Sequence, residues 1–235
     1  RFLEELGFSR AIDFHAFLCE AVQVPERLER LAGPLQRRLG VRIEPMAHKR
    51  AQRKRDIETV FRIYNRAWEG NWGHVPMTAD EYAAVVEELL PLVEPDLILF
   101  ARQGSETLGF SLGLPDYNQV LRVMGGRMHP WALLKAFGAR RKINAVRVMA
   151  MGILPEHQGR GIDSLLHLHS FRNGLARGVV RSEFSWVLDN NRPMMNLAVK
   201  LGGVRYKTYR IYEKNLNGGE KELGQRSLTD VAPVD

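Results

Sequence analysis

Cysteine is nearly absent from this sequence of 235 residues, since Cys19 is its only one. A single cysteine excludes an intramolecular disulfide and a multi-cysteine zinc site, and it is typical of a reducing compartment. Long apolar runs are missing too, because no stretch approaches the ~20 residues of a membrane span. The first residues also lack the pattern of a secretory signal. We therefore expect a cytoplasmic protein, at most peripheral on the inner membrane face, while the start at Arg1 leaves room for a longer natural N-terminus.

No compositional bias marks the chain as fibrous or disordered. Hydrophobic residues make up 45% of it and charged residues 26%, which is the profile of a globular protein with a sizeable core. The length favours one domain with an appendage. The formal net charge of +7 suits phosphate-bearing ligands, anionic membranes or nucleic acid, and does not choose among them.

Hydrophobic patterning predicts an α/β domain with a mixed sheet over residues 41–214. A Thr78–Glu81 capping box begins the second helix of this domain, and the fourth strand is apolar enough to be buried on both faces. Residues 115–144 show little regularity. The expected strands are 41–46, 96–102, 107–114, 145–154, 183–188 and 204–212, and the expected helices are 57–68, 78–90, 162–175 and 194–201.

The two ends of the chain are predicted to lie outside this domain. Residues 1–40 read as a helix–strand–helix appendage whose second helix is interrupted at Gly33-Pro34. Residues 215–235 read as a mobile polar tail. Leu6-Gly7-Phe8 and the aromatic residues after it also match Leu201-Gly202-Gly203 and its followers at a constant offset. The appendage can thus be the end of a preceding, similar domain, although a helix, a glycine and an aromatic strand are a common ending.

The stretch VMAMGILPEHQGRGID, residues 148–163, is the most informative part of the sequence. A predicted strand runs there into a glycine-rich turn that begins a helix. Unpaired N–H groups at a helix N-terminus attract phosphate, and Gly159 and Gly161 would let a pyrophosphate approach them beside the charge of Arg160. The spacing fits neither a P-loop nor the three-glycine dinucleotide fingerprint, and a plain tight turn is the alternative.

The residues Gln158-Gly159-Arg160-Gly161-Ile162 resemble the pyrophosphate loop of the GCN5-related N-acetyltransferase (GNAT) superfamily. The pattern of that loop is Gln or Arg, two residues, Gly, one residue, and Gly or Ala. The strand SEFSWVL and the helix that begins at Asn191 also follow in the family's order. The resemblance spans 41–214 and implies the acyl-CoA N-acyltransferase fold, with a mixed, mostly antiparallel central sheet flanked by helices.

The same resemblance implies acyl-CoA as the acyl donor. Asp163 departs from the pattern, because it stands where the family has a small residue, and its carboxylate would repel phosphate unless it points away. Ala198 departs as well, because many members carry at that place the tyrosine that protonates the leaving thiolate. The residues assigned to acyl-CoA binding are Met151, Gly152, Ile153, Gln158, Gly159, Arg160, Gly161, Ile162, Asp163 and Asn191.

The catalytic groups must come from other elements. Direct attack of an amine on a thioester needs a proton acceptor and a way to settle charge on sulfur. The strand at 145–154 holds no carboxylate, so Glu183 on the next strand is the nearest suitable base, and an ordinary surface glutamate is its alternative role. Tyr206 and Tyr209 on the last strand are the candidates that replace the missing acid.

Three residues are candidates for acceptor binding. Trp72 lies between the two helices that in this family lean over the acceptor cleft, and it can instead be a hydrophobic plug. Asp116 and Asn118 follow the third strand, where a capped turn is at least as good an interpretation. His167 and His169 are two residues apart on a helix and face different ways, so we expect no metal site.

Residues 127–142, RMHPWALLKAFGARRK, combine apolar and basic side chains in the manner of a lid or an interfacial helix. Such a segment suits an anionic membrane or a cover over a long acyl chain, and a surface helix that packs on the sheet is the alternative.

We interpret the chain as an N-acyltransferase that moves an acyl group from acyl-CoA to a primary amine by direct attack. The interfacial segment and the internal match suggest a lipid-like acceptor, as in bacterial lipid-forming members that resemble ceramide synthases. The alternative is a catalytically degenerate module with the GNAT fold that binds CoA or a partner. A nucleic-acid binder that uses the basic run at 48–55 ranks last, because the run lacks interleaved aromatic residues, and we expect no nucleic-acid partner.

Overall fold

The structure, a computed structural model, describes residues 2–20, 23–24 and 26–216. Most of the predicted tail, residues 217–235, lies outside the described residues. Short helical segments in the described chain are α1 (Phe2–Glu5) and the 3-10 helices η1 (Leu90–Leu92), η2 (Pro95–Leu97) and η3 (Pro155–His157).

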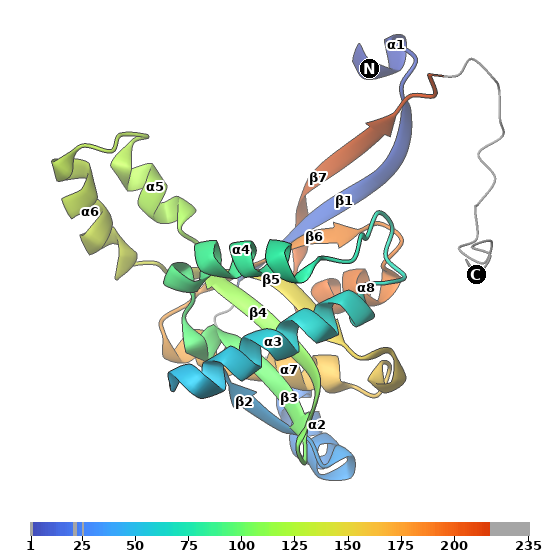
Figure 1. The fold of residues 1–235 in the computed structure, drawn as a ribbon, viewed down its shortest axis with the longest axis vertical. Helices are drawn as coiled ribbons and strands as arrows, with labels where there is room; N and C mark the ends of the chain where they lie inside the picture. The colour runs from blue at the N-terminus through green and yellow to red at the C-terminus, as the bar shows by residue number, and fades with distance from the viewer. Residues whose placement is uncertain (1, 21–22, 25, 217–235) are drawn as a thin grey trace.

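Seven strands form one sheet in the order β2-β3-β4-β5-β6-β1-β7 (Figure 1). β5 and β6 run parallel, and the other neighbouring pairs are antiparallel. The sheet is therefore mixed and mostly antiparallel, which confirms the expected fold class. The strands are β1 (Ser9–Glu20), β2 (Arg42–Pro45), β3 (Ile98–Gln103), β4 (Glu106–Pro115), β5 (Ala145–Ile153), β6 (Arg181–Leu188) and β7 (Val204–Glu213).

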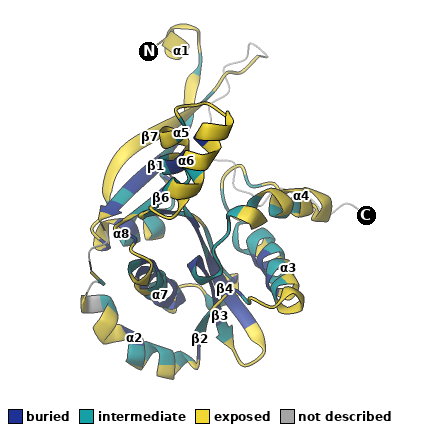
Figure 2. Cartoon of the chain, turned by 90° about the vertical axis from the view of Figure 1, so that its left-hand side faces the viewer, coloured by how far each residue is buried: buried dark blue, intermediate teal, exposed yellow. Residues whose placement is uncertain are grey.

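Helices cover both faces of this sheet (Figure 2). α3 (Arg50–Ala67) and α4 (Ala79–Leu89) lie on one face, and α2 (Glu26–Leu39), α7 (Ile162–Ala176) and α8 (Arg192–Lys200) lie on the other. Successive side chains of a strand point to opposite faces, so Phe100 packs with Ile63 of α3 while Leu99 packs with Leu166 of α7. The expected capping box of α4 is present, because Thr78 Oγ1 accepts from the Glu81 N–H and Glu81 accepts from the Thr78 N–H.

Residues from the predicted appendage are part of the same sheet. β1 lies between β6 and β7 and pairs with both. Its pairing with β6 begins with Phe14 opposite Leu188, and its pairing with β7 begins with Ser9 opposite Glu213. α2 packs on α7, and it runs through Pro34 without the expected interruption. The boundary at residue 40 and a tandem origin of residues 1–40 remain predictions.

Residues 115–144 are more regular than expected, although a helix within 127–142 is among the interpretations of the sequence. They form α5 (Asn118–Met124) and α6 (Pro130–Arg140), a helical hairpin that projects from the body of the molecule (Figure 1). Gly125 and Gly126 make the turn with φ angles of 60° and 70°, which favour glycine, and Pro130 begins α6 at a position where a missing N–H costs little. The seven-residue α5 is too short for helical periodicity to be visible in the sequence.

β5 is also less buried than its apolar sequence predicts. Most of its residues are half-exposed, and Met149 is 39% exposed. The physical reason is that β6 accompanies β5 along residues 145–148 only. The second half of β5 therefore has a neighbour on one side.

Candidate active site

The separation of β5 from β6 begins at a β-bulge. In the register with β4, Val148 lies opposite Gly113 and Ala150 opposite Leu112, so Met149 is an extra residue. A bulge adds local twist and bends its strand. The last ladder pair of the parallel strands, Val148 with Phe184, stands directly before it. β5 and β6 consequently diverge beyond this point and leave an opening in the sheet.

The backbone of β5 faces this opening. The Leu154 N–H donates to the Leu108 carbonyl of β4, so the backbone groups of Leu154 face β4. Backbone groups alternate in direction along a strand, and the N–H and C=O groups of Met151 and Ile153 therefore point away from β4. Their carbonyls accept side-chain hydrogen bonds, from Trp68 Nε1 at 3.2 Å and from Gln158 Nε2 at 3.0 Å. The N–H groups of this open edge can therefore receive an extended ligand.

The glycine-rich loop follows at the end of the same edge. Gly159 has a φ of +69° with nothing within 4 Å of where a Cβ would stand, whereas Gly161 has a φ of +92° and a Cβ there would lie 3.0 Å from Leu35. Gly161 is the N-cap of α7. The free N–H groups of the first turn of α7 and the exposed Arg160 give this end a positive potential, which suits a phosphate.

Other predicted CoA residues have structural tasks. Gly152 is needed for packing, because a Cβ there would lie 2.9 Å from Phe110. Ile162 is buried in the core between the sheet and α7. The Asn191 side chain caps α8 by accepting from the Met194 N–H at 3.1 Å. Asp163 is half-buried in the first turn of α7. Any CoA contact from Ile162 must come from its backbone, whereas the backbone groups of Gly152 point toward β4 by the same alternation.

Glu183 lies at the closed end of the opening and is not a free surface carboxylate. It accepts hydrogen bonds of 2.5 Å from Ser185 Oγ and from the Tyr206 hydroxyl, and its Oε1 is 3.7 Å from Arg147 Nε. Burial alone would raise the pKa of Glu183, but these hydrogen bonds and the charge of Arg147 outweigh it, so the pKa lies below its ordinary value. The structure thus joins Glu183 and Tyr206 and keeps the carboxylate ionised.

Burial and the neighbouring Glu183 carboxylate raise the pKa of Tyr206 above its ordinary value. Tyr206 therefore holds its proton firmly and donates it in a hydrogen bond. Tyr209, the other candidate acid, packs against Trp186, with ring centroids 5.7 Å apart. The structure does not bring Tyr209 into the hydrogen-bonded cluster.

The cluster faces the side of the sheet that α3 and α4 cover elsewhere. Phe184 and Val148 pack toward α7 and α8, so their neighbours Glu183 and Arg147 point the opposite way. On that side a cleft of about 660 Å³ contains Glu183 and Tyr206 together with the predicted acceptor residues Asp116 and Asn118. Four cationic residues also line it: Arg122, Arg147, Arg181 and Lys207.

Asp116 and Asn118 combine both interpretations made from the sequence. Asp116 Oδ1 accepts from the Asn118 N–H at 3.1 Å and from its Nδ2 at 2.9 Å, which is a turn capped ahead of α5. The same pair lines the cleft. Trp72 lies apart from the residues that line this cleft. It contacts Phe14 edge-on, and Phe14 contacts Trp186 in turn, so the three rings form an aromatic cluster beside the opening.

A second, apolar pocket of about 300 Å³ lies between α3, α4 and the sheet. Met149 and Ala150 of β5 form one of its walls, and Val86 and Leu89 of α4 form another. Trp68, which binds the Met151 carbonyl, lines it as well. The pocket therefore reaches the bulge where the sheet opens.

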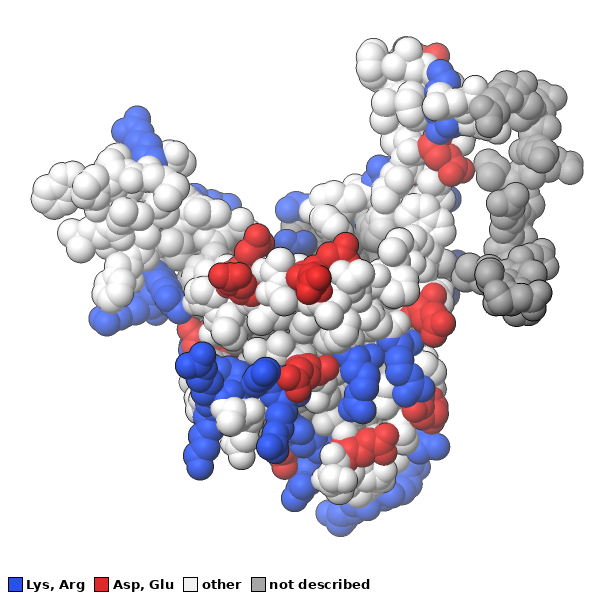
Figure 3. Space-filling view, in the orientation of Figure 1, with Lys and Arg blue, Asp and Glu red and all other residues white. Residues whose placement is uncertain are grey.

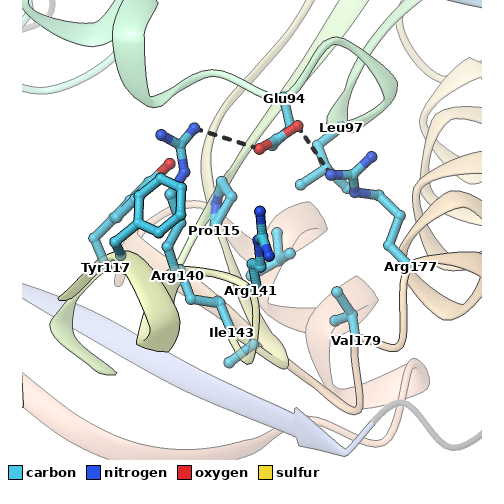
Figure 4. Close-up of a pocket in the computed structure, with 12 residues that line it drawn as sticks. Glu94, Leu97, Pro115, Tyr117, Arg140, Arg141, Ile143, Arg177 and Val179 are labelled. Atoms are coloured by element: carbon cyan, nitrogen blue, oxygen red, sulfur yellow. Dashed lines mark hydrogen bonds and ion pairs between the residues drawn. The ribbon is translucent and has the colours of Figure 1, made fainter. Parts of the chain in front are cut away.

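A further pocket of about 520 Å³ lies at the base of α6 and at the C-terminal end of α7, the end remote from the glycine-rich loop (Figure 4). Glu94 closes one side of it by pairing with Arg177 at 2.9 Å and with Arg140 at 3.7 Å. These contacts tie α6 to the body of the molecule. No residue of the loop at 158–163 lines this pocket, so we do not place the acyl transfer there.

Several residues of the site have no recognisable signal in the sequence. Met149 follows Val148 in a continuous apolar run, and only the strand register shows that it bulges. Arg147 reaches Glu183 and Ser185 only because β5 pairs with β6, and no local pattern in the sequence records that pairing. Within residues 2–20, 23–24 and 26–216, no three His, Cys, Asp or Glu side chains gather in a group that could hold a metal ion.

Comparison with known proteins gives two kinds of match. No protein-family model matches the chain. Among curated proteins, Protein YghO of Escherichia coli is 30% identical over 223 residues, 91% of this chain and 56% of that protein. The bacterial ceramide synthase of Caulobacter vibrioides is also 30% identical over 223 residues, which are 91% of this chain and 57% of that protein. The chain thus spans little more than half the length of either relative.

Solved structures match at low identity. A GCN5-related N-acetyltransferase from Sphaerobacter thermophilus is 16% identical with a TM-score of 0.58, over 90% of this chain and 54% of that one. A GCN5-related glucosamine N-acetyltransferase region of a fungal β-N-acetylglucosaminidase is 14% identical with a TM-score of 0.56. That match covers 90% of this chain and 22% of the fungal chain. Both matches extend over 90% of this chain and therefore include its mixed sheet. The chain therefore has the acyl-CoA N-acyltransferase fold of the GNAT superfamily.

Proposed function

We propose that the protein is an N-acyltransferase that transfers an acyl group from acyl-CoA to the primary amine of a lipid-like acceptor. The observation that carries this proposal is the continuity of the open edge of β5 with the glycine-rich loop. A ligand with a pyrophosphate at one end and an extended amide-containing arm at the other matches that arrangement. Acyl-CoA has this form, and when bound it supplies an activated thioester.

The residues of the chain would hold the donor in two places. N–H groups at the start of α7, together with Arg160, would bind the pyrophosphate. The outward N–H groups of Met151 and Ile153 would bind the arm and polarise the thioester carbonyl. The amine nitrogen then bonds to the carbonyl carbon, the carbon–sulfur bond breaks, and sulfur leaves with the electron pair as CoA thiolate.

Glu183 would act on the acceptor side. Its ionised carboxylate can bind the acceptor in its ammonium form, and the ammonium must release one proton to solvent before its nitrogen can attack. The carboxylate can then take up the proton that the nitrogen loses as the amide forms, while Tyr206 and Ser185 fix its orientation. Its lowered pKa makes it a weak base, so electrostatic binding of the amine is its main contribution. An alanine side chain has no ionisable proton, and Ala198 is fully buried in the core, so the proton for the thiolate must come from elsewhere.

The apolar pocket supports a lipid-like acceptor. It ends at Met149 and lies on the same side of the sheet as Glu183, so an alkyl chain in the pocket would bring an attached amine toward the opening. A relative of this chain is named a bacterial ceramide synthase, which fits an acceptor of this chemistry.

A catalytically degenerate CoA-binding module is the second candidate. The alanine at position 198 and the low pKa of Glu183 favour it, because neither an acid for sulfur nor a strong base is in place. Such a module would bind CoA and leave the thioester intact.

A thermal-shift titration with CoA, acetyl-CoA and palmitoyl-CoA tests the binding site first. A ligand that binds the folded state alone raises stability by about 2.7 kcal/mol at 100 times its Kd. We expect all three ligands to raise the melting temperature. Gly159→Ala should remove most of this shift, because it puts a Cβ and backbone strain where phosphate must approach.

Gly104→Ala is the matched control, since Gly104 has a φ of +58° and equally open surroundings in the β3–β4 turn. Equal CoA shifts in the two variants would refute the loop assignment. Release of free CoA thiol from palmitoyl-CoA then tests the reaction. Release that depends on a long-chain primary amine supports the acyltransferase, whereas CoA binding without any release with short or long amines supports the degenerate module.

A further inference from the structure

The α5–α6 hairpin exposes an unusual amount of apolar surface. Trp131 is 73% exposed, and the exposure of the other large apolar side chains ranges from 49% for Leu133 to 79% for Met128. A surface helix normally turns such residues toward the core. The exposed set is Leu121, Val123, Met128, Trp131, Leu133, Leu134 and Phe137.

The covered side of the hairpin uses small residues instead. Ala132 of α6 is 2% exposed, Ala136 and Ala139 are partly covered, and Val120 of α5 is buried. α5 and α6 therefore pack closely through short side chains, and the large ones are left on the outside. The hairpin is helical in the structure and leaves its large apolar side chains unburied, so that surface is available to a partner.

The charge of the hairpin is of one sign. Residues 117–144 contain no Asp or Glu, and they contain the cations Arg122, Arg127, Lys135, Arg140, Arg141 and Lys142. Figure 3 shows the projecting lobe as a white surface bordered by blue, with no red on it. Arg140 is engaged at the base of the hairpin, where it pairs with Glu94 and lies over the Tyr117 ring.

We propose that this hairpin docks on an anionic lipid bilayer. Exposed Trp, Leu and Phe side chains enter the interfacial region of a membrane. The charged ends of neighbouring Lys and Arg side chains bind anionic headgroups, while their methylene stems lie among apolar groups. A protein groove could also bind the apolar residues, but it would not require that acidic residues be absent from all 28 positions of 117–144. An anionic bilayer repels acidic residues and therefore accounts for their absence. Among the helices that the structure describes, none has the length and apolar character of a membrane span.

Docking also orients the cleft. Asn118, Gln119 and Arg122 of α5 line the same cleft as Glu183 and Tyr206. A hairpin that lies on a bilayer therefore brings the mouth of the cleft close to the lipid surface. The proposal goes beyond the acyl transfer and does not depend on it, because membrane binding can be measured without acyl-CoA or turnover.

Vesicle flotation with the whole chain tests the proposal. We expect binding to phosphatidylcholine vesicles that contain about one-third phosphatidylglycerol, and at least tenfold weaker binding to phosphatidylcholine alone. Leu134→Glu should weaken binding to the anionic vesicles by at least tenfold, since it replaces an inserting side chain with a charge of the wrong sign. Leu31→Glu is the matched control, because Leu31 is an exposed leucine on α2, at 54% against 64% for Leu134. That control should bind as the parent chain does.

The cations give an independent arm. Lys135→Glu and Lys142→Glu should each weaken binding by at least about fivefold, and about 1 M salt should do the same for the parent chain. Circular dichroism and melting temperature check that the variants remain folded. The proposal is overturned by absence of binding to anionic vesicles, by equal loss in the Leu31 control, or by a dimer in light scattering that Leu134→Glu dissociates while vesicle binding is unchanged.

Discussion

At the residue scale, Glu183 shows how neighbours decide what a carboxylate can do. Its pKa is lowered by Ser185, Tyr206 and Arg147 in spite of its burial. The group therefore attracts a positively charged amine better than it removes a proton from one.

Glu183→Gln tests this assignment with little change in volume. We expect kcat/KM for the amine to fall by about 10²-fold or more, because an electrostatic partner of the acceptor is lost. The CoA-induced melting shift should stay as it is. Tyr206→Phe, which removes one hydrogen bond and no charge, should cost less, and a Glu183→Gln enzyme with full kcat/KM would rule Glu183 out of the site.

His167 gives a prediction for stability against pH. Burial on α7 lowers the pKa of His167 from its ordinary 6.5 to about 4. The unfolded chain binds a proton first as the pH falls, so the stability is fully present above pH 6.5 and decreases by about 3 kcal/mol toward pH 4.

Urea denaturation between pH 4 and 7 measures this dependence. In His167→Gln, which cannot take up a proton there, the slope should be smaller than in the parent chain. A slope of the same size in both proteins would show that other groups, such as the half-buried His169, dominate the acid response.

At the scale of elements, the bulge in β5 and the helices α3 and α4 define the acceptor side. α4 supplies Val86 to the apolar pocket, and Met149 supplies the end nearest to the opening. The fit of an alkyl chain therefore depends on how closely α4 lies to the sheet.

Val86→Trp should fill part of the pocket. We expect KM for a long-chain amine to rise by at least tenfold, from the lost burial of several methylene groups at about 0.8 kcal/mol each. A short, polar amine should react as before. Ala84→Trp, on an exposed position of the same helix that does not line the pocket, is the control, and equal effects in the two variants would contradict the assignment.

At the scale of the whole molecule, β1 joins the start of the chain to its end. It is hydrogen-bonded on both sides, and Ala16, Phe17 and Cys19 are buried in the core. Loss of such a strand would expose the edges of β6 and β7 together with apolar side chains.

Deleting residues 1–20 should therefore abolish cooperative thermal unfolding or make the chain aggregate, since several buried apolar residues at about 1.5–3 kcal/mol each rival the stability of a typical domain. Deleting residues 1–8 alone should have little effect, because α1 contributes no buried residue. An unchanged melting temperature after the longer deletion would instead show that residues 41–214 are an independent domain.

Local rules allowed much of the sequence to be interpreted correctly. Alternation, helical spacing, the Thr78–Glu81 box and the glycine-rich turn depend on neighbours within a few residues, and each has the predicted form in the structure. The short α5 was not predicted, because helical periodicity becomes visible only over a longer segment. The continuity of α2 through Pro34 was not predicted either, because tertiary packing can override the local effect of a proline.

What the sequence by itself determined is most of the helices and strands of residues 41–214, their order and the position of the loop at 158–163. Tertiary structure alone decided which residues of different elements meet. The bulge at Met149, the insertion of β1 between β6 and β7, and the bonding of Glu183 to Tyr206 all arise from strand pairing across distant parts of the chain. Pairing register is set by packing of the whole sheet, so no local pattern records it.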